Sequence, residues 1–486
     1  MAGHYGLRMG VAALALANAA LAPWSAAALA SPAPPPPASL LPPAAGLPAP
    51  TPSPDGTLNP DGSQTSVVQP VPGETVPNQT GGTPTAAAIP LPEPVMTWTA
   101  DDAAALLQYI GTVASEGLIP ADYQPDQLRA AIDAVKAGGP GSDLDAQASR
   151  SFDWLVEDLR DGRTPMAARQ EWFAVDPDAD LMPTATVLAK ALATHDIAGT
   201  LTALDPVNGE FAALKDALAT TPVDAQEQRD LIRVNMDRWR WLPRELGMIY
   251  LIVNVPEFQV RLVANHQVIR TYRTIVGRPG RTATPQLAET VKAVVFNPTW
   301  TVPQSIIQHE PHFAALAANP AMARREGYVV TTSDSGAVTL VQQPGPKNSL
   351  GLMKIDMPNP HAIYLHDTPS RSLFDRPVRA FSHGCIRTEK AVELGMTMAM
   401  LGANMTPAEA IEKTNSHKYA RVAMSRTFPV YINYSTYGRD PQGQLTRFND
   451  LYGRDAPVLA SLAAPRQMHT TQRVSSEPII KAEDPL

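Results

Sequence analysis

The sequence predicts an α+β protein in which a mainly α-helical domain precedes a β-rich domain with a few short helices. Two patterns support this prediction. Apolar residues recur at helical spacing over residues 97–243. Short runs of alternating or β-branched apolar residues, typical of strands, then continue over residues 244–455. The length of 486 residues also exceeds the usual size of one hydrophobic core, so several folded units are expected.

The first 30 residues have the features of a secretory signal peptide. Arg8 supplies a positive charge, residues 9–21 form an apolar stretch, and Ala28 and Ala30 provide small side chains before a cleavage site. The stretch is too short to span a bilayer as a mature helix, although an uncleaved membrane anchor is the alternative. We therefore expect export of the chain.

Two further segments lack the pattern of a folded domain. Residues 31–96 are rich in Pro and Ala and predict a disordered linker, because such sequence buries too little apolar surface to fold. We expect residues 456–486 to be a disordered tail.

The predicted helical domain begins with a capping signal. Thr99 precedes Asp101 and Asp102, which suit the first turn of a helix. Later in the domain, four apolar residues fall at positions i, i+3, i+4 and i+7 of one helix face: Phe152, Leu155, Val156 and Leu159. Pro243 marks the expected end of the domain. This region has no cluster of His, Cys or paired carboxylates that suggests chemistry.

Strand-like runs fill the second domain. Asn265 and His266 separate two of them, as in a tight hairpin. The predicted strands cover residues 248–255, 257–263, 267–277, 291–298, 328–332, 337–343, 362–366 and 420–435.

Two short helices are expected near the end of this domain. One covers residues 388–401, with Thr388 as its N-cap. The second begins with a capping box in which Thr406 is the cap, Pro407 is the first helical residue and Glu409 reaches back.

Charge and cysteine content limit the function classes. A net charge of −8 argues against a dedicated nucleic-acid binder, which needs a basic face. The chain has one cysteine, Cys385, and an exported protein meets an oxidising environment. A lone thiol there is either an inert buried residue or a reactive group.

The surroundings of Cys385 favour reactivity. Gly384 permits a positive φ, and we expect the N-terminus of a helix within about three residues, which together with Arg387 would favour a thiolate. Nearby histidines provide candidate bases, and Asp367 is a candidate orienter of His366 through its side chain or its carbonyl. Two alternatives are a buried apolar cysteine and a zinc site, whose ligands would be His361, His366, His383 and Cys385. Their spacing does not match the usual zinc patterns.

The stretch "HDTPSRSLFDRPVRAFSHGCIR", residues 366–387, resembles the signature of the L,D-transpeptidase catalytic domain, the YkuD-like family. Blocks such as "VGRPGRTATP", "VVFNPTWTVPQSI" and "YGRD" are similar to the larger, YcbB-like branch of that family. "SFDWLVEDLRDGR" is similar to the scaffold domain of the same branch. The resemblance extends over residues 244–455 and into the helical domain.

The resemblance implies a catalytic domain built on a mixed sheet or β-sandwich, and it implies roles for particular residues. Cys385 is the nucleophile and His366 the base, with no cofactor and no metal. The N–H groups of Gly384 and Cys385, helped by the Tyr364 hydroxyl, form the oxyanion hole. Other candidate pocket and substrate-binding residues are Ser382, His383, Arg387, Asn348 and Lys354.

The resemblance also implies a periplasmic peptidoglycan enzyme of a Gram-negative-type bacterium. Such enzymes attack the third residue of a tetrapeptide stem and transfer it to the amine of a second stem, forming a 3→3 cross-link. Carbapenems are an implied class of covalent inhibitor, and residues 304–344 an implied lid. Alternatives are an L,D-carboxypeptidase, an enzyme that attaches a protein to the stem, and a non-catalytic wall-binding scaffold.

Overall fold

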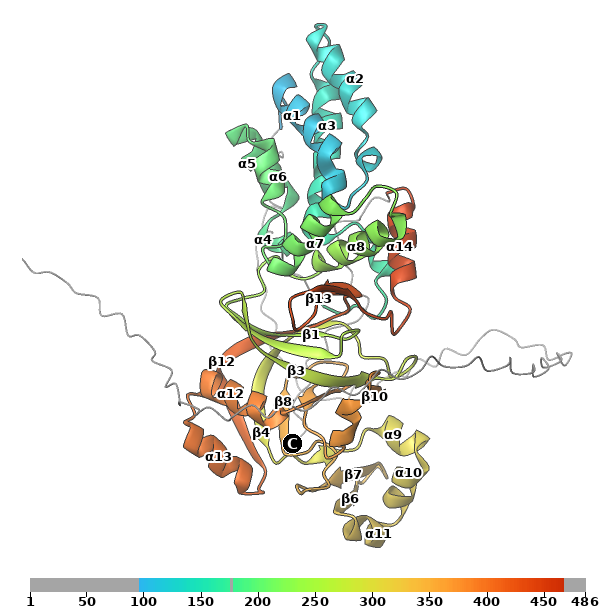
Figure 1. Ribbon diagram of the computed structural model, residues 1–486, viewed down its shortest axis with the longest axis vertical. Helices are drawn as coiled ribbons and strands as arrows, with labels where there is room; N and C mark the ends of the chain where they lie inside the picture. The colour runs from blue at the N-terminus through green and yellow to red at the C-terminus, as the bar shows by residue number, and fades with distance from the viewer. Residues whose placement is uncertain (1–95, 175–177, 467–486) are drawn as a thin grey trace, which may run out of the picture. The chain divides into compact units, whose positions relative to one another are not determined.

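The computed structural model describes residues 96–174 and 178–466 (Figure 1). The predicted signal peptide, the linker up to residue 95 and the end of the predicted tail lie outside the described residues.

The first part of the described chain is helical. Thr99 accepts a hydrogen bond from the Asp102 N–H and caps the first helix, as predicted. The predicted apolar face, Phe152 to Leu159, is fully buried in the core of this part. The helices are α1 (Ala100–Thr112), α2 (Pro125–Lys136), α3 (Ser142–Asp161), α4 (Asp178–Leu181), α5 (Thr184–Thr194), α6 (Ile197–Thr202), α7 (Gly209–Thr220) and α8 (Gln226–Trp239).

A mixed nine-stranded sheet follows, with the order β10-β3-β11-β9-β8-β4-β12-β1-β2. Because β2 also pairs with β3, the strands close into a ring and β10 lies outside it. The predicted fold class, a helical part followed by a β-rich part, is confirmed. The strands are β1 (Ile249–Asn254), β2 (Gln259–Ala264), β3 (Gln267–Gly277), β4 (Leu287–Phe296), β8 (Met353–Asp356), β9 (Leu365–His366), β10 (Ala380–Ser382), β11 (Ile386–Thr388) and β12 (Ala420–Asn433).

Local signals determine several connections in this sheet. Asn265 and His266 both have positive φ, 50° and 61°, as a two-residue hairpin turn between β2 and β3 requires. The capping box predicted at Thr406 and Glu409 is present at the start of α13 (Pro407–Asn415).

The predicted lid segment forms a small structure with its own apolar core, which includes Trp300, Leu316, Tyr328 and Leu340 (Figure 1). It is an insertion between β4 and β8. Its elements are β5 (Trp300–Thr301), α9 (Gln304–His309), α10 (Pro311–Ala318), α11 (Pro320–Arg325), β6 (Tyr328–Thr332) and β7 (Val338–Gln342).

Two sequence predictions are wrong here. Thr388 is not an N-cap, because it belongs to β11, and α12 (Ala391–Ala403) starts after Lys390, which has a φ of 52°. The predicted tail is not disordered at its start, because α14 (Asp455–Ala463) packs against α8 (Figure 1). Short side chains and alanines gave α14 a weak periodic signal, and its stability comes from this tertiary contact.

The helical part and the sheet share a third apolar core. It includes Trp241 after α8, Tyr250 of β1, Tyr431 of β12 and Val458 of α14. An ion pair of 2.6 Å joins the buried Arg238 of α8 to the half-buried Asp455 at the start of α14. No helix within residues 96–174 and 178–466 is long and apolar enough to cross a membrane.

Arg466 provides a test of how the C-terminal segment is held. Its Nε lies 2.9 Å from the Oδ2 of Asp158, which is fully buried in α3. Burial raises the pKa of Asp158 to about 6, and the Arg466 cation opposes that rise. We expect Arg466→Met to raise this pKa further and to lower the free energy of unfolding by about 3 kcal/mol at pH 8.

The loss should be smaller at pH 5. An acid whose pKa is higher in the folded state than in the unfolded state loses folding stability as the pH rises between the two values. In Arg466→Met the folded-state pKa of Asp158 is higher still, so folding stability continues to fall up to a higher pH than in the wild type. Urea unfolding at pH 5 and pH 8 measures the free energy of unfolding of the variant and the wild type. The control is Arg447→Met, which removes an exposed ion pair with Glu227. An equal loss at both pH values would indicate lost packing instead of lost charge pairing.

Candidate active site

The parallel pairing of β9 with β11 assembles the site. The register places Arg387 beside His366, and Lys354 of β8 lies on the other side of His366. Cys385 comes two residues before Arg387 and Tyr364 two residues before His366. Because alternate residues of a strand share a face, these five side chains lie on one face of the sheet.

The buried ring of His366 is held in one tautomer. Its Nδ1 lies 2.6 Å from the carbonyl oxygen of Asp367, so Nδ1 carries a proton and donates it, and Nε2 is left as the basic nitrogen. Burial, together with the nearby Arg387 and Lys354 cations, lowers the pKa of His366 to about 3. The imidazole is therefore neutral at physiological pH.

Asp367 orients His366 through its backbone. Its buried carboxylate is used elsewhere, since Oδ2 accepts from the Leu352 N–H at 3.0 Å and Oδ1 pairs with Arg371 at 2.6 Å. The question that the sequence left open is thereby answered: the carbonyl fixes the tautomer, and the side chain anchors the loop before β8.

The thiol of Cys385 is protonated in this state. Its Sγ donates to the carbonyl of Ala362 at 3.4 Å. Burial raises the pKa of the thiol, while hydrogen bonds from Tyr364 and the charges of Lys354 and Arg387 oppose the rise. The expectation of a helix N-terminus that favours a thiolate is wrong, because β11 follows Cys385 directly.

The turn that carries Cys385 is held by the side chain of Ser382 and by backbone groups of the same turn. Gly384 has a φ of 120°, a conformation nearly restricted to glycine. The Oγ of Ser382 accepts from the Gly384 N–H at 3.2 Å and donates to the Cys385 carbonyl at 2.6 Å. Of the two N–H groups expected in the oxyanion hole, that of Gly384 is thus occupied. The Cys385 N–H has no acceptor among the described residues.

Tyr364 lies close to both Lys354 and His366. Its ring centroid is 4.5 Å from the Nζ of Lys354 and 5.6 Å from the ring of His366. Burial and the neighbouring Cys385 raise the pKa of Tyr364 well above its ordinary value. The hydroxyl therefore keeps its proton and can donate a hydrogen bond. Lys354 also pairs with Asp356 at 2.8 Å.

Arg387 and His383 of the motif differ in their contacts. Arg387 has no hydrogen bond or ion pair to any described residue, and its Nε is buried without a partner. His383 instead pairs through Nε2 with Glu310 of the insertion at 2.7 Å. The preceding residue, His309, accepts from Arg281 at 3.0 Å. The insertion thus contacts the Cys385 loop through Glu310 and the loop between β3 and β4 through His309.

Asn348 is not placed to bind a substrate. Its amide nitrogen donates to the carbonyls of Pro298 and Gln343, each at 3.0 Å, and its oxygen accepts from the Leu350 N–H. The residue is buried and organises the loop after the insertion.

Sequence reasoning missed Asn359. Its side chain donates to the carbonyls of Met357 and Ile363 and accepts from the Ile363 N–H. These bonds replace strand pairing, so the predicted strand 362–366 is reduced to Leu365–His366 and Ala362 adopts a φ of 52°. The Asn-Pro pair at 359–360 is a turn signal that indicated this loop.

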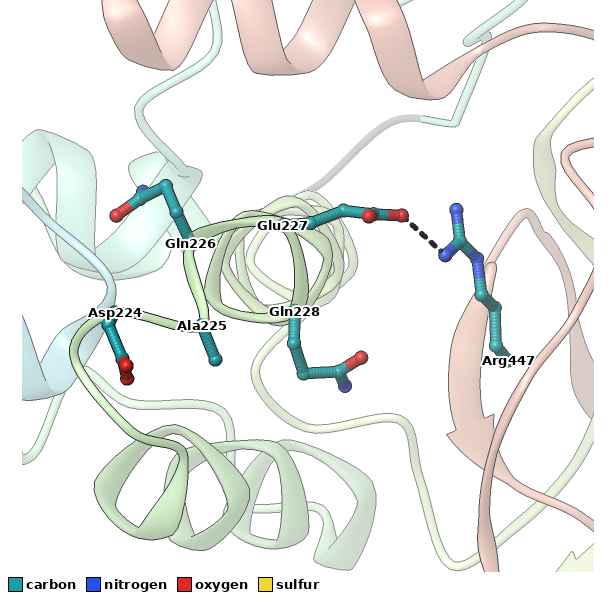
Figure 2. A pocket seen from close by; sticks show the side chains of 6 residues that line it. All are labelled: Asp224, Ala225, Gln226, Glu227, Gln228 and Arg447. Atoms are coloured by element: carbon teal, nitrogen blue, oxygen red, sulfur yellow. Dashed lines mark hydrogen bonds and ion pairs between the residues drawn. The ribbon is translucent and has the colours of Figure 1, made fainter.

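The zinc site considered from the sequence does not form within residues 96–174 and 178–466, where no group of three or more suitable ligands is found. The ring of His361 packs instead on Phe173, with centroids 4.1 Å apart. Figure 2 shows a separate surface hollow at the start of α8, where Glu227 pairs with Arg447 of β14 (Leu445–Arg447) at 2.7 Å. It contains none of the candidate site residues.

Solved structures to which the chain shows similarity include an L,D-transpeptidase from Mycobacterium smegmatis, the avibactam carbamoyl enzyme of Ldtfm, and LdtMt1 in complex with imipenem. Their identities to this chain are 13%, 13% and 14%, and each TM-score is 0.19. The matched regions cover 38%, 40% and 38% of this chain and 58%, 51% and 58% of the respective solved chains. TM-scores this low carry no argument about function.

Comparison of the sequence with a curated protein and with family models is more informative. A curated Haemophilus influenzae protein named "Putative L,D-transpeptidase" is 28% identical over 242 residues, which are 47% of this chain and 48% of that protein. The match thus spans about half of the relative. Residues 94–218 match the scaffold domain, and residues 248–398 match the L,D-transpeptidase catalytic domain, YkuD. The chain therefore carries a YkuD-type L,D-transpeptidase catalytic domain preceded by a scaffold domain.

Proposed function

We propose that this protein is a periplasmic L,D-transpeptidase that forms 3→3 peptidoglycan cross-links through a thioester on Cys385. The observation that carries the proposal is the common face of β9 and β11. There Tyr364, Lys354 and Arg387 act on the only thiol of the chain, and the strand pairing places His366 beside Arg387. The Nε2 of His366 is left as its basic nitrogen, Tyr364 keeps its proton, and Arg387 has no ion pair within the described part of the chain. These groups match the requirements of acyl transfer by a cysteine nucleophile.

Acylation begins from a neutral pair. The Nε2 of His366 removes the Sγ proton as the sulfur attacks the carbonyl carbon of the third stem residue. The C–S bond forms, and the carbonyl electron pair moves to oxygen, where the Cys385 N–H and the Tyr364 hydroxyl stabilise it. When the pair returns, the C–N bond breaks and His366 gives its proton to the leaving D-alanine amine.

Deacylation reverses these roles. The side-chain amine of a second stem gives a proton to His366 and attacks the thioester carbon. The new C–N bond forms, the C–S bond breaks and the proton returns to the sulfur. Donor tetrapeptide and acceptor amine are the proposed partners, and no cofactor is required by this chemistry.

Arg387 is the proposed contact for a substrate carboxylate. Arg387 is half-buried, its Nε is buried without a partner among the described residues, and a carboxylate with two oxygens can satisfy its guanidinium. Lys354 is already paired with Asp356, so its contribution is a general positive charge beneath Tyr364.

The proposed periplasmic location is supported by the N-terminal sequence, whose pattern indicates export, and the Gram-negative-type source by the family resemblance. A single thiol suits an oxidising compartment, because no second cysteine is present to trap it in an internal disulfide.

The first prediction concerns the products. Wild-type protein incubated with tetrapeptide-bearing muropeptides should give 3→3 dimers, detected by mass spectrometry. Cys385→Ala should abolish them, and His366→Asn should slow their formation about 10²- to 10⁴-fold, because proton transfer is lost. His266→Asn, in the hairpin turn with φ of 61°, is the control and should keep full activity.

Other products would change the assignment. Tripeptide alone would identify an L,D-carboxypeptidase, and stem attached to a protein would identify a protein-linking enzyme. Full dimer formation by Cys385→Ala would exclude the thioester altogether.

The second prediction concerns pH. Because the pKa of the thiol is raised, the thiolate is a minor species at neutral pH and grows about tenfold per pH unit below that pKa. Alkylation of the resting protein by iodoacetamide should therefore accelerate about tenfold per unit from pH 7 to pH 9. Intact mass reports it without ambiguity, since the chain has one cysteine. A rate that is already constant above pH 6 would indicate a preformed ion pair with His366.

The third prediction concerns the insertion, which we propose excludes water so that amines resolve the thioester. Glu310→Gln weakens the contact with His383 and should raise the proportion of hydrolysed tripeptide about two- to fivefold relative to dimer. Glu326→Gln is a matched control, because Glu326 pairs with His312 within the insertion and does not reach the Cys385 loop. The same product ratio in both variants would refute the role of this contact.

A further inference from the structure

Thr284 is a buried residue between β3 and β4 that contacts the Cys385 turn through its side chain. Its Oγ1 lies 2.7 Å from the carbonyl oxygen of Gly384 and 2.9 Å from the amide nitrogen of Gly277. The Gly277 N–H can only donate, so Oγ1 accepts from it. The single hydroxyl proton is then directed to the Gly384 carbonyl.

That hydrogen bond fixes the orientation of the next N–H group. In a trans peptide the C=O of one residue and the N–H of the following residue point in opposite directions. When Thr284 holds the Gly384 carbonyl on one side, the Cys385 N–H points to the other. The remaining polar groups around it are occupied, since Ser382 binds the Gly384 N–H and the Cys385 carbonyl.

Thr284 is itself held on both sides of its backbone. Its N–H donates to the Tyr452 hydroxyl at 3.2 Å, and that hydroxyl donates to the Gly277 carbonyl at 2.7 Å. Its carbonyl accepts from Arg454 at 3.4 Å. The loop approaches β3 so closely that a Cβ at Gly277 would lie 1.9 Å from the Thr282 carbonyl oxygen.

We propose that Thr284 is a positioning residue for the reaction, which holds the Gly384–Cys385 peptide so that the Cys385 N–H faces the reacting carbonyl oxygen. The proposal rests on the proposed function, because an oxyanion forms only in acyl transfer. Thr284 does not touch the thiol, and it acts through the peptide. Its effect should therefore be large for reactions that develop an oxyanion and small for reactions of the sulfur that do not.

Two reagents separate these cases. Imipenem acylates through its β-lactam carbonyl: the C–S bond forms, the ring C–N bond breaks and the nitrogen takes a proton, with an oxyanion on the way. Iodoacetamide alkylates the same sulfur by displacing iodide from carbon, with no oxyanion. Intact mass at one pH gives both rates, and thermal unfolding reports the stability of each variant.

Thr284→Val should slow acylation about 10- to 100-fold and change alkylation less than about threefold. Thr284→Ser keeps the hydroxyl and should restore acylation to within about threefold of wild type. Thr274→Val is the matched control, since Thr274 is a buried threonine of β3 whose hydroxyl has no partner within the described chain. Should Thr284→Val fail to fold, Tyr452→Phe removes the support of Thr284 and should slow acylation about 3- to 10-fold.

The outcomes distinguish this proposal from the proposed function. Acylation of Thr284→Val at the wild-type rate, or a parallel loss of acylation and alkylation, would overturn the positioning role alone. Wild-type protein that is alkylated but never acylated would overturn the proposed function and this inference with it.

Discussion

The pairing between β9 and β11 is the contact on which the site depends, and it involves two of the shortest strands of the sheet. β9 has two residues and β11 has three, so few backbone hydrogen bonds hold their register. A slip of one residue would turn His366 to the opposite face from Cys385. The loops at both ends prevent it: the Asn359 side chain organises the chain before β9, and the carboxylate of Asp367 anchors the chain after it.

The C-terminal "YGRD" stretch, residues 452–455, connects the helical part to Thr284 and the end of β3. Tyr452 and Arg454 hold Thr284 against the Cys385 turn, and Asp455 pairs with Arg238 of α8. Arg238 is buried, so this ion pair would be expensive to break from one side. Residues of one short stretch thus contact both the helical part and Thr284, which in turn binds the Gly384 carbonyl before Cys385.

Sequence patterns were sufficient where neighbours in the chain determine the structure. The Thr406 capping box, the hairpin turn at Asn265 and the apolar face of α3 depend on residues a few positions apart. The predictions of an N-cap at Thr388 and of disorder at the start of the tail were wrong, because partners distant in sequence determine both structures. Thr388 pairs with Thr274 of β3, and α14 packs against α8. Asn348 was misassigned for the same reason, since its amide binds carbonyls that only the fold brings to it.

The cations of the site do not set the protonation of Cys385 and His366, the proposed catalytic pair. Arg387 and Lys354 lower the pKa of the thiol, which favours the thiolate, and they also lower the pKa of His366, which disfavours the imidazolium. These effects oppose each other in any transfer of a proton from sulfur to nitrogen. Burial disfavours both charged forms, so the resting pair is neutral. In the proposed reaction the barrier to attack must then be lowered mainly where charge develops, on the substrate oxygen, so the orientation of the Cys385 N–H matters more than the charge of the pair.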